Sequence, residues 1–228
     1  MLGSLFRDLK TRRKRADQPP VPAIRPDTPA VLNVGGNDKA IPIPAHYAGW
    51  QHLLLDIDAR RDVDVVCDAR ELEGFDAARF DAVYCSHNLE HYYRHDVPRV
   101  LAGFLHVLKS DGFAEIRVPD LEAVFRKVTN GDLGLEDDLY DSPSGPIAVI
   151  DVIYGWTKEI ESSGEHFFAH KTGFTAKSLA ATIQRAGFQE TWMAPAFSVY
   201  ELRAIAFKQA STPEQRNRLG IPLDAPAG

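Results

Sequence analysis

The sequence contains no long apolar run, and this absence limits where the protein can reside. A transmembrane helix needs about 20 consecutive apolar residues. No apolar stretch in the 228 residues comes close to that length. The opening segment, MLGSLFRDLKTRRKRADQ, also lacks the apolar core of a secretory signal. We therefore expect no integral membrane segment and a cytoplasmic location.

Cysteine is equally scarce. Only Cys67 and Cys85 occur, and both lie in apolar runs typical of strands. Secreted domains more often carry a framework of disulfides, whereas two buried thiols fit a reducing compartment.

Basic residues are concentrated at the start of the sequence, and acidic residues outnumber them in the rest. The net charge is −6, although basic residues outnumber acidic ones through Asp17. An acidic body argues against nucleic acid as the main partner. The basic head could touch RNA or an anionic membrane, but a solvated terminus is the simpler interpretation.

The chain divides into three zones. Residues 1–29 form a basic N-terminal segment followed by a proline-rich linker, and residues 210–228 are polar and predicted to be a flexible tail. Residues 30–209 alternate apolar runs with helical patterns and are predicted to fold as one domain. Within it, residues 130–174 form an unusually long connection, rich in aromatic residues and histidine, which we expect to reach a ligand site.

Short, nearly continuous apolar runs predict strands that are buried on both faces, as in a parallel sheet. The predicted strands are 30–34, 52–57, 63–68, 81–86, 113–118, about 189–197 and 199–208. Helical patterns cover 95–110, a segment beginning near Asp120, and a segment from a Thr175 cap to a Gly187 stop. This alternation predicts an α/β doubly wound sheet, mostly parallel, with an antiparallel C-terminal strand.

Three consecutive strand ends carry residues suited to a nucleoside-like ligand. Gly35 and Gly36 end the first strand, where glycine lets the backbone approach a ligand closely. Asp56, with Asp58 two residues on, ends the second strand, where a carboxylate can bind ribose hydroxyls. Asp68 ends the third. Pro42 and Pro44 spoil the helix that a dinucleotide pyrophosphate would need.

The stretch FDAVYCSHNLEHYYRHDVPRVLAGFLHVLKSDGFAEIRVPDL, residues 80–121, carries a family resemblance. With LNVGG before it and DVVCDAREL between, it resembles the class I S-adenosylmethionine-dependent methyltransferases, which have a Rossmann-like fold. DVIYGW (151–156) and HKTGF (170–174) look like the acceptor-side segment of one bacterial group. The glycine motif departs from the usual GxGxG, being reduced to GGN.

This resemblance implies S-adenosyl-L-methionine as the cofactor and suggests how the residues divide. Asn33, Gly35 and Gly36 would face the methionine portion. Asp56 with Ile57 would hold the ribose, and Asp68 with Ala69 the adenine. Ser86 and His87 would form the floor of the pocket.

The methyl acceptor is not evident, and we expect a small molecule or a glycan-type compound. An oxygen or nitrogen acceptor often needs a base nearby. The candidates are His87, His91, His166 and His170, with Tyr154 as a hydrogen-bonding partner, and Tyr154 and His170 are expected to face inward. A structural role for each remains an alternative. A non-catalytic domain that binds the cofactor or a partner is the second hypothesis, which the reduced glycine motif would suit.

HNLEH (87–91) permits a third hypothesis, because it matches the H-x-x-E-H motif of a zinc hydrolase. That motif must lie in a helix to bring His87 and His91 together. Here it follows a predicted strand directly, and the sequence shows no convincing third ligand. We therefore expect no metal site, with His91 and Glu90 serving to bond the loop to the strand end as an alternative role.

Overall fold

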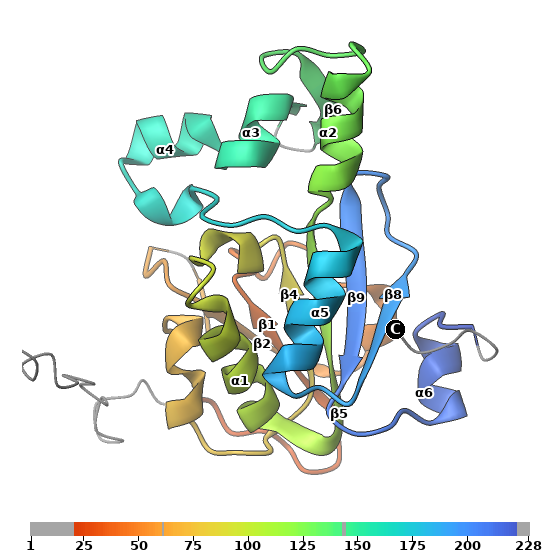
Figure 1. Cartoon of the computed structure of the whole chain (residues 1–228). Coiled ribbons are helices and arrows are strands. Elements are labelled where there is room, and N and C mark those ends of the chain that lie inside the picture. Colours follow the sequence, from red (N-terminus) through yellow and green to blue (C-terminus); the bar gives the residue numbers. More distant parts are fainter. Residues whose placement is uncertain (1–20, 61, 143–144, 223–228) are drawn as a thin grey trace, which may run out of the picture.

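A seven-stranded sheet organises the chain in the computed structural model, which describes residues 21–60, 62–142 and 145–222 (Figure 1). Its strands are β1 (Ala30–Val34), β2 (Gln51–Asp56), β3 (Val65–Val66), β4 (Phe80–Ser86), β5 (Leu108–Pro119), β8 (Glu190–Ala194) and β9 (Glu201–Phe207). Their order is β3-β2-β1-β4-β5-β9-β8. All neighbours from β3 to β5 are parallel, and only β9 runs antiparallel, to both β5 and β8. The predicted fold class is confirmed.

The helices and 3₁₀ turns connect these strands. They are η2 (Ala45–Tyr47), η3 (Ala69–Gly74), η4 (Leu89–His91), α1 (Val97–Val107), α2 (Leu121–Thr129), α3 (Val149–Tyr154), α4 (Thr157–Ser163), η5 (His166–Phe168), α5 (Ala176–Ala186) and α6 (Pro213–Arg218). The predicted caps hold: Thr175 accepts a hydrogen bond from the Ser178 amide, and Gly187 ends α5 at φ +108°. Asp120 caps α2 through the amides of Glu122 and Ala123.

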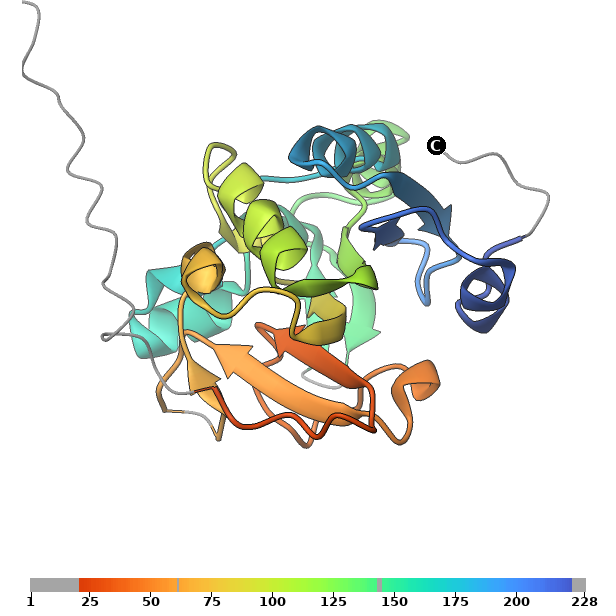
Figure 2. The ribbon, with the colours of Figure 1, turned by 90° about the horizontal axis from the view of Figure 1, so that it is seen from below.

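Successive side chains of each strand point to opposite faces of the sheet, and both faces are buried. Even-numbered residues of β1, such as Leu32, pack under α1, α5 and η3, which cover one face (Figures 1 and 2). Val31 instead joins a second core cluster on the opposite face, with Tyr47 of η2 and Leu219 after α6. This second face also holds a buried ionic group, Glu115, which contacts Arg117 and Arg203.

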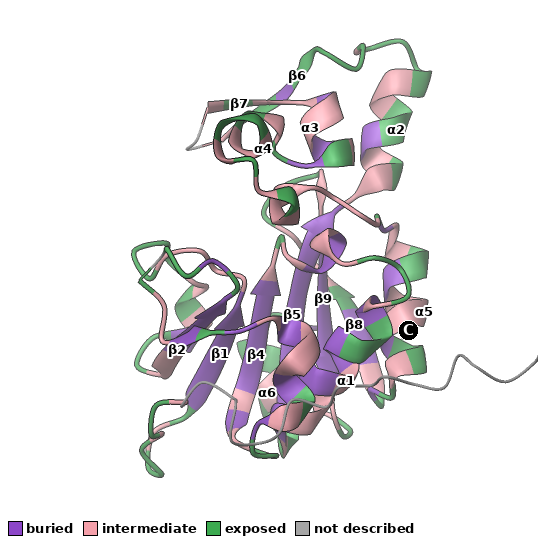
Figure 3. Ribbon diagram, turned by 90° about the vertical axis from the view of Figure 1, so that its left-hand side faces the viewer, coloured by how far each residue is buried: buried purple, intermediate pink, exposed green. Residues whose placement is uncertain are grey.

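Residues 130–174 form a separate layer above the carboxyl ends of the parallel strands (Figures 1 and 3). This insertion contains α3, α4, η5 and a hairpin of β6 (Asp138–Ser142) and β7 (Gly145–Ala148). Its own small core joins Leu139, Val149 and Val152 to Val124 of α2. The remainder of the layer is largely exposed or half-buried, in contrast to the sheet below it (Figure 3).

The two ends of the described chain are more closely packed than the sequence suggested. Val21 and Ile24 of the proline-rich linker are partly buried against the main core. Residues 210–222 were expected to be a loose tail but contain α6, and the side chains of Leu219 and Ile221 are buried. Leu219 and Ile221 join the core cluster on the second face, and the Leu219 carbonyl oxygen accepts from Arg203 of β9. The basic segment and residues 223–228 lie outside the described residues.

Candidate functional site

A cavity of about 540 Å³ lies between the carboxyl ends of the strands and the insertion. One half is formed by strand-end residues, including Gly35, Asn37, Asp56, Ile57, Asp68 and His87. The other half is formed by residues of the insertion, including Tyr140, Ile147, Val152, Trp156, Phe168 and His170. The carboxyl ends of a doubly wound sheet are where ligands of such folds bind.

In the glycine turn after β1 the backbone lies very close to neighbouring side chains. Gly35 has φ +72°, and its amide donates to the carbonyl oxygen of Leu55 at 2.8 Å. A Cβ atom on Gly35 would lie 2.0 Å from Nδ2 of Asn88, and one on Gly36 would lie 2.2 Å from Nδ2 of Asn33. Only glycine fits at either position. Of the three predicted residues here, Gly35 lines the cavity, whereas Gly36 rests on Asn33 behind the turn.

Asn33 lies on the face of the sheet turned away from α1. Its side chain is 2% exposed, and its Nδ2 lies 3.1 Å from Nε2 of His52. It is not among the residues that line the cavity. Asn33 therefore supports the turn rather than touching the space where a ligand would lie.

The carboxylate of Asp56 borders the cavity and holds the loops around it. Its Oδ2 accepts from the Asn37 amide at 3.0 Å, and its Oδ1 accepts from the Asp58 amide at 2.9 Å. Each carboxylate oxygen retains acceptor capacity beyond one bond. Asp58 also lines the cavity and is held by Arg60 through both carboxylate oxygens.

Asp68 is engaged by the residue two positions on. Arg70 donates to it from Nε at 3.0 Å and from a terminal nitrogen at 2.6 Å, and reaches Asp96 with another at 3.1 Å. Both Asp68 and Arg70 line the cavity. Ala69, predicted beside Asp68, is 1% exposed and packs in the core, because it begins η3 with its side chain toward the helix layer.

His87 occupies a strained turn at the end of β4. Its φ is +49°, unusual for a residue with a Cβ atom. Nε2 of its ring lies 3.1 Å from Glu201, and Nδ1 lies 3.5 Å from Glu90. Desolvation disfavours the ring's charge, but these two carboxylates outweigh it and raise the pKa of His87 to about 10. His87 lines the cavity, whereas Ser86, the last residue of β4, does not.

Two histidines from distant segments meet at the cavity wall. The rings of His91 and His170 are 4.8 Å apart and edge to face, and both line the cavity. Nδ1 of His91 lies 3.1 Å from the Ala169 carbonyl oxygen, and Nδ1 of His170 lies 2.8 Å from that of Val152. A carbonyl can only accept, so each Nδ1 carries the proton. Burial lowers the pKa of His170.

Tyr154 is not at the cavity, contrary to the expected inward orientation. Its side chain is 60% exposed and does not appear among the lining residues. Val149 and Val152 occupy the inner face of α3, and Tyr154, two residues after Val152, falls on the outer face. The backbone of Tyr154 does help to place a residue of the cavity wall, because its carbonyl oxygen accepts from the His170 amide at 2.9 Å. His166 begins η5 and also does not line the cavity.

The helical geometry of a zinc peptidase is absent from HNLEH. β4 extends to Ser86, and residues 89–91 form a single 3₁₀ turn. His87 turns toward Glu201 and does not share a helical face with His91. The zinc hydrolase interpretation therefore lacks its structural basis.

Several cavity residues escaped the sequence patterns. They include Arg70, Asn88, Tyr92, Tyr93, Tyr140 and Trp156. Tyr92 and Tyr93 follow HNLEH directly. Their position just after a predicted strand end was the sequence feature that could have marked them as cavity residues. Tyr140 lies on a hairpin whose position over the sheet depends on tertiary contacts that local patterns do not encode.

Comparison with known proteins agrees with this geometry. Residues 46–116, from η2 through most of β5, match the family model described as "Methyltransferase domain". A S-adenosylmethionine-dependent methyltransferase from Archaeoglobus fulgidus has a TM-score of 0.51 at 13% identity, covering 80% of this chain and 87% of that chain. The PH0226 protein from Pyrococcus horikoshii has a TM-score of 0.53 at 13% identity, covering 80% and 82%. A comparison with curated proteins gave no match.

Residues 46–116 thus match a methyltransferase domain, and the order and direction of the strands are those of a Rossmann-like methyltransferase fold. The resemblance of the sequence implies S-adenosylmethionine as the cofactor. The residues present fit that group, because the cradle at Gly35 would be filled by a Cβ atom and the Asp56 carboxylate borders the adjacent cavity. Within the described ranges, no helix is long and apolar enough to cross a membrane.

Proposed function

We propose that this enzyme methylates a small-molecule or glycan-type acceptor in the cytoplasm. The observation that carries the proposal is a cavity with two different halves: strand ends on one side and the aromatic insertion on the other. Its volume of about 540 Å³ falls in the range of small-molecule sites. The two free, buried thiols, Cys67 and Cys85, suit a reducing compartment.

The strand-end half is the proposed cofactor site. Gly35 would lie against the methionine portion, and Asp56 with Ile57 would take the ribose. Asp68 would accept from the adenine amino group with an oxygen that Arg70 leaves partly free. Asn33, Gly36, Ala69 and Ser86 would act indirectly, by supporting the turn and the strand ends from behind.

The insertion half is the proposed acceptor site. Bound S-adenosylmethionine supplies an electrophilic methyl group for in-line displacement. The aromatic side chains of Trp156, Phe167 and Phe168 line this half and would exclude water. Nε2 of His91 and of His170 would accept a hydrogen bond from an acceptor O–H or N–H group. The raised pKa of His87 makes its ring a cation that positions Glu90 and Glu201, not a base.

Calorimetry with S-adenosylhomocysteine tests the first half of this proposal. We expect one saturable site per chain. Transfer of label from methyl-labelled S-adenosylmethionine to fractions of a small-molecule extract tests the second half, and we expect at least one labelled product. Absence of binding at millimolar ligand would overturn the proposed site.

A non-catalytic cofactor-binding or partner-binding domain is a second candidate, favoured by one observation. Two of the carboxylates at the cofactor half are already paired with arginines: Arg60 binds both oxygens of Asp58, and the guanidinium of Arg70 donates twice to Oδ2 of Asp68. Such a domain would bind S-adenosylhomocysteine yet label no extract fraction. The two measurements therefore separate the candidates.

A further inference from the structure

Glu90 stands out as a buried carboxylate without a hydrogen-bonding donor. Its side chain is 1% exposed, and within the described chain neither Oε1 nor Oε2 has a hydrogen-bond partner. The nearest cation is His87, whose Nδ1 lies 3.5 Å from Oε1 and whose other ring nitrogen is shared with Glu201. His87 compensates part of the charge, but no donor satisfies either oxygen, and leaving buried carboxylate oxygens without a hydrogen bond is costly.

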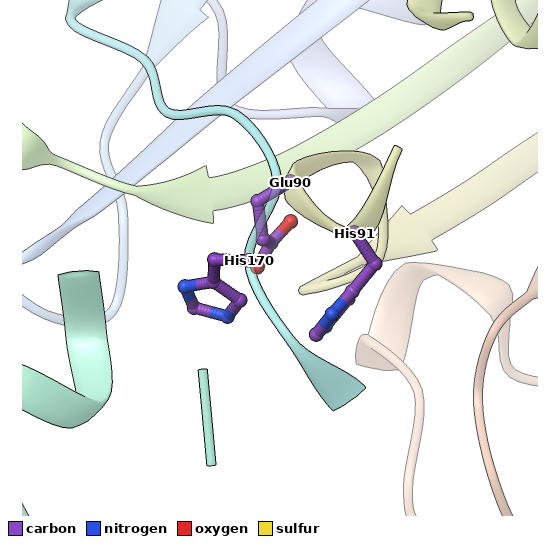
Figure 4. A group of neighbouring side chains, drawn as sticks. All are labelled: Glu90, His91 and His170. Atoms are coloured by element: carbon purple, nitrogen blue, oxygen red, sulfur yellow. The ribbon is translucent and has the colours of Figure 1, made fainter. Parts of the chain in front are cut away.

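The two histidines at the cavity wall complete the arrangement. Glu90, His91 and His170 each present a potential ligand atom, and these atoms lie within 4.8 Å of one another (Figure 4). In Figure 4 the carboxylate lies between the two rings. Zinc–nitrogen bonds of about 2.0–2.1 Å require the side chains to close further by rotation about their χ angles.

The imidazoles are already oriented as metal ligands usually are. In protein metal sites the ligating histidine typically donates its second ring N–H to a carbonyl or carboxylate, which fixes the tautomer. Nδ1 of His91 donates to Ala169 and Nδ1 of His170 donates to Val152, so in the neutral form of each ring the lone pair lies on Nε2.

The backbone holds the two segments in register. The carbonyl oxygen of Glu90 accepts from the amides of Lys171 and Thr172, at 2.8 and 3.1 Å. His170 is thereby placed beside a turn that precedes it by some eighty positions in the chain. This supplies the third ligand that HNLEH lacked, and assigns Glu90 as a ligand and not as the general base.

We propose that Glu90, His91 and His170 bind a divalent first-row metal ion, with Zn²⁺ as the preferred ion in vitro. A set of two histidines and one carboxylate leaves coordination positions open, and both rings border the cavity. With Nε2 of both rings bound to the ion, the acceptor would bind the ion in place of the direct hydrogen bonds to these two rings. The ion would polarise an oxygen of the acceptor, which favours hydroxyl-bearing or carboxylate-bearing acceptors. This assignment rests on the proposed function for the identity of the acceptor half, but not for the site itself.

Metal titration of the untagged full-length chain tests the site. We expect one Zn²⁺ per chain by calorimetry and elemental analysis, and a tetrahedral or five-coordinate Co²⁺ absorption spectrum. His170→Ala and the near-isosteric Glu90→Gln should each weaken Zn²⁺ binding by about 100-fold or more. His95→Ala is the matched control, because His95 is 80% exposed, does not line the cavity and should change the affinity less than about twofold.

S-adenosylhomocysteine affinity, measured on the same samples, separates this proposal from the proposed function. We expect all three variants to bind it within about threefold of the unmodified chain. Zinc binding that is weak, or that is equal in all variants, would mean an adventitious surface ion and would overturn the metal site while leaving cofactor binding intact. Zinc binding lost in Glu90→Gln without any S-adenosylhomocysteine binding would support the metal site and refute the methyltransferase assignment of the cavity.

Discussion

Gly35 and Asn88 touch across the ends of β1 and β4, so closely that a Cβ atom on Gly35 would lie 2.0 Å from Nδ2 of the amide. Gly35→Ala should therefore move Asn88 into the cavity. We expect S-adenosylhomocysteine affinity to fall at least about tenfold and the unfolding free energy to fall by about 2 kcal/mol or more, measured by calorimetry and urea unfolding.

Gly49→Ala is the control for Gly35→Ala. Gly49 also has positive φ, +82°, but no atom lies within 4 Å of its would-be Cβ. It should lose about 1 kcal/mol from backbone strain alone, with cofactor affinity unchanged. Equal loss of affinity in both variants would show that the contact with Asn88 does not shape the site.

Asp56→Ala should weaken S-adenosylhomocysteine binding by about 1.5–3 kcal/mol, the scale of a hydrogen bond to a charged group. Asp64→Ala serves as a comparison, since Asp64 accepts from the Leu54 amide on the same strand at 2.7 Å and does not line the cavity. Both variants lose a bond that holds the loops, but only the first should lose affinity in calorimetry. Unchanged affinity in Asp56→Ala would transfer the role to Asp58.

Glu115 should stabilise the fold in a pH-dependent manner. Burial alone would raise its pKa, but His46, Arg203 and Arg117 outweigh this and lower the pKa to about 2. Because the folded value lies below the unfolded value of about 4.3, the contribution is complete at neutral pH. It should then be lost as the pH falls from about 4.5 toward 2.

Glu115→Gln tests this assignment. The variant should lose about 3 kcal/mol in urea unfolding at pH 7, because Arg203 and Arg117 stay buried without the Glu115 carboxylate and only Arg117 keeps a second one, Glu201. The difference from the unmodified chain should shrink below about pH 4. Glu122→Gln, at an exposed pair with Arg126, should cost less than about 0.5 kcal/mol at any pH. A difference for Glu115→Gln that stays constant down to pH 3 would contradict the sign of the shift.

Tyr154→Phe should leave thermal stability and S-adenosylhomocysteine affinity unchanged within about 0.5 kcal/mol, since the ring is 60% exposed and away from the cavity. His170→Ala should instead lower the unfolding free energy by about 1–2 kcal/mol through loss of its 2.8 Å bond to Val152. Thermal melts beside calorimetry provide the comparison. A large effect of Tyr154→Phe on affinity would mean that α3 turns inward when the cofactor binds.

The strands were predictable because each is short, apolar and bounded by glycine, proline or aspartate. β1 begins and ends as expected, at Ala30 and Val34, whereas the run 63–68 pairs only at Val65 and Val66. The difference arises because β3 lies at the edge of the sheet and pairs only with β2. The apolar character of the run does not show how many of its residues form that pairing.

The site was predictable only as far as strand ends could be read. Gly35, Asp56 and Asp68 line the cavity because parallel strands bring their carboxyl ends to one edge. Tyr154 could not be placed from sequence, since its side of α3 is decided by contacts with Val124 and Leu139 from other elements. Likewise His170 meets Glu90 only through backbone bonds between distant segments, which no spacing rule anticipates.

The segment made of α2 and the insertion leaves the sheet and returns to it at neighbouring points. Asp120 and Phe174 form a bridge, and the Leu121 amide donates to the carbonyl oxygen of Phe174 at 3.1 Å. The distance between the two attachment points is thus set by the scaffold and not by what lies between them. Segments of different length can be exchanged at this junction without stretching the sheet, since loop closure depends only weakly on length. The proposed acceptor half of the cavity can therefore be exchanged as one unit, and chimeras joined at residues 120 and 174 would test whether this segment decides which compound is methylated.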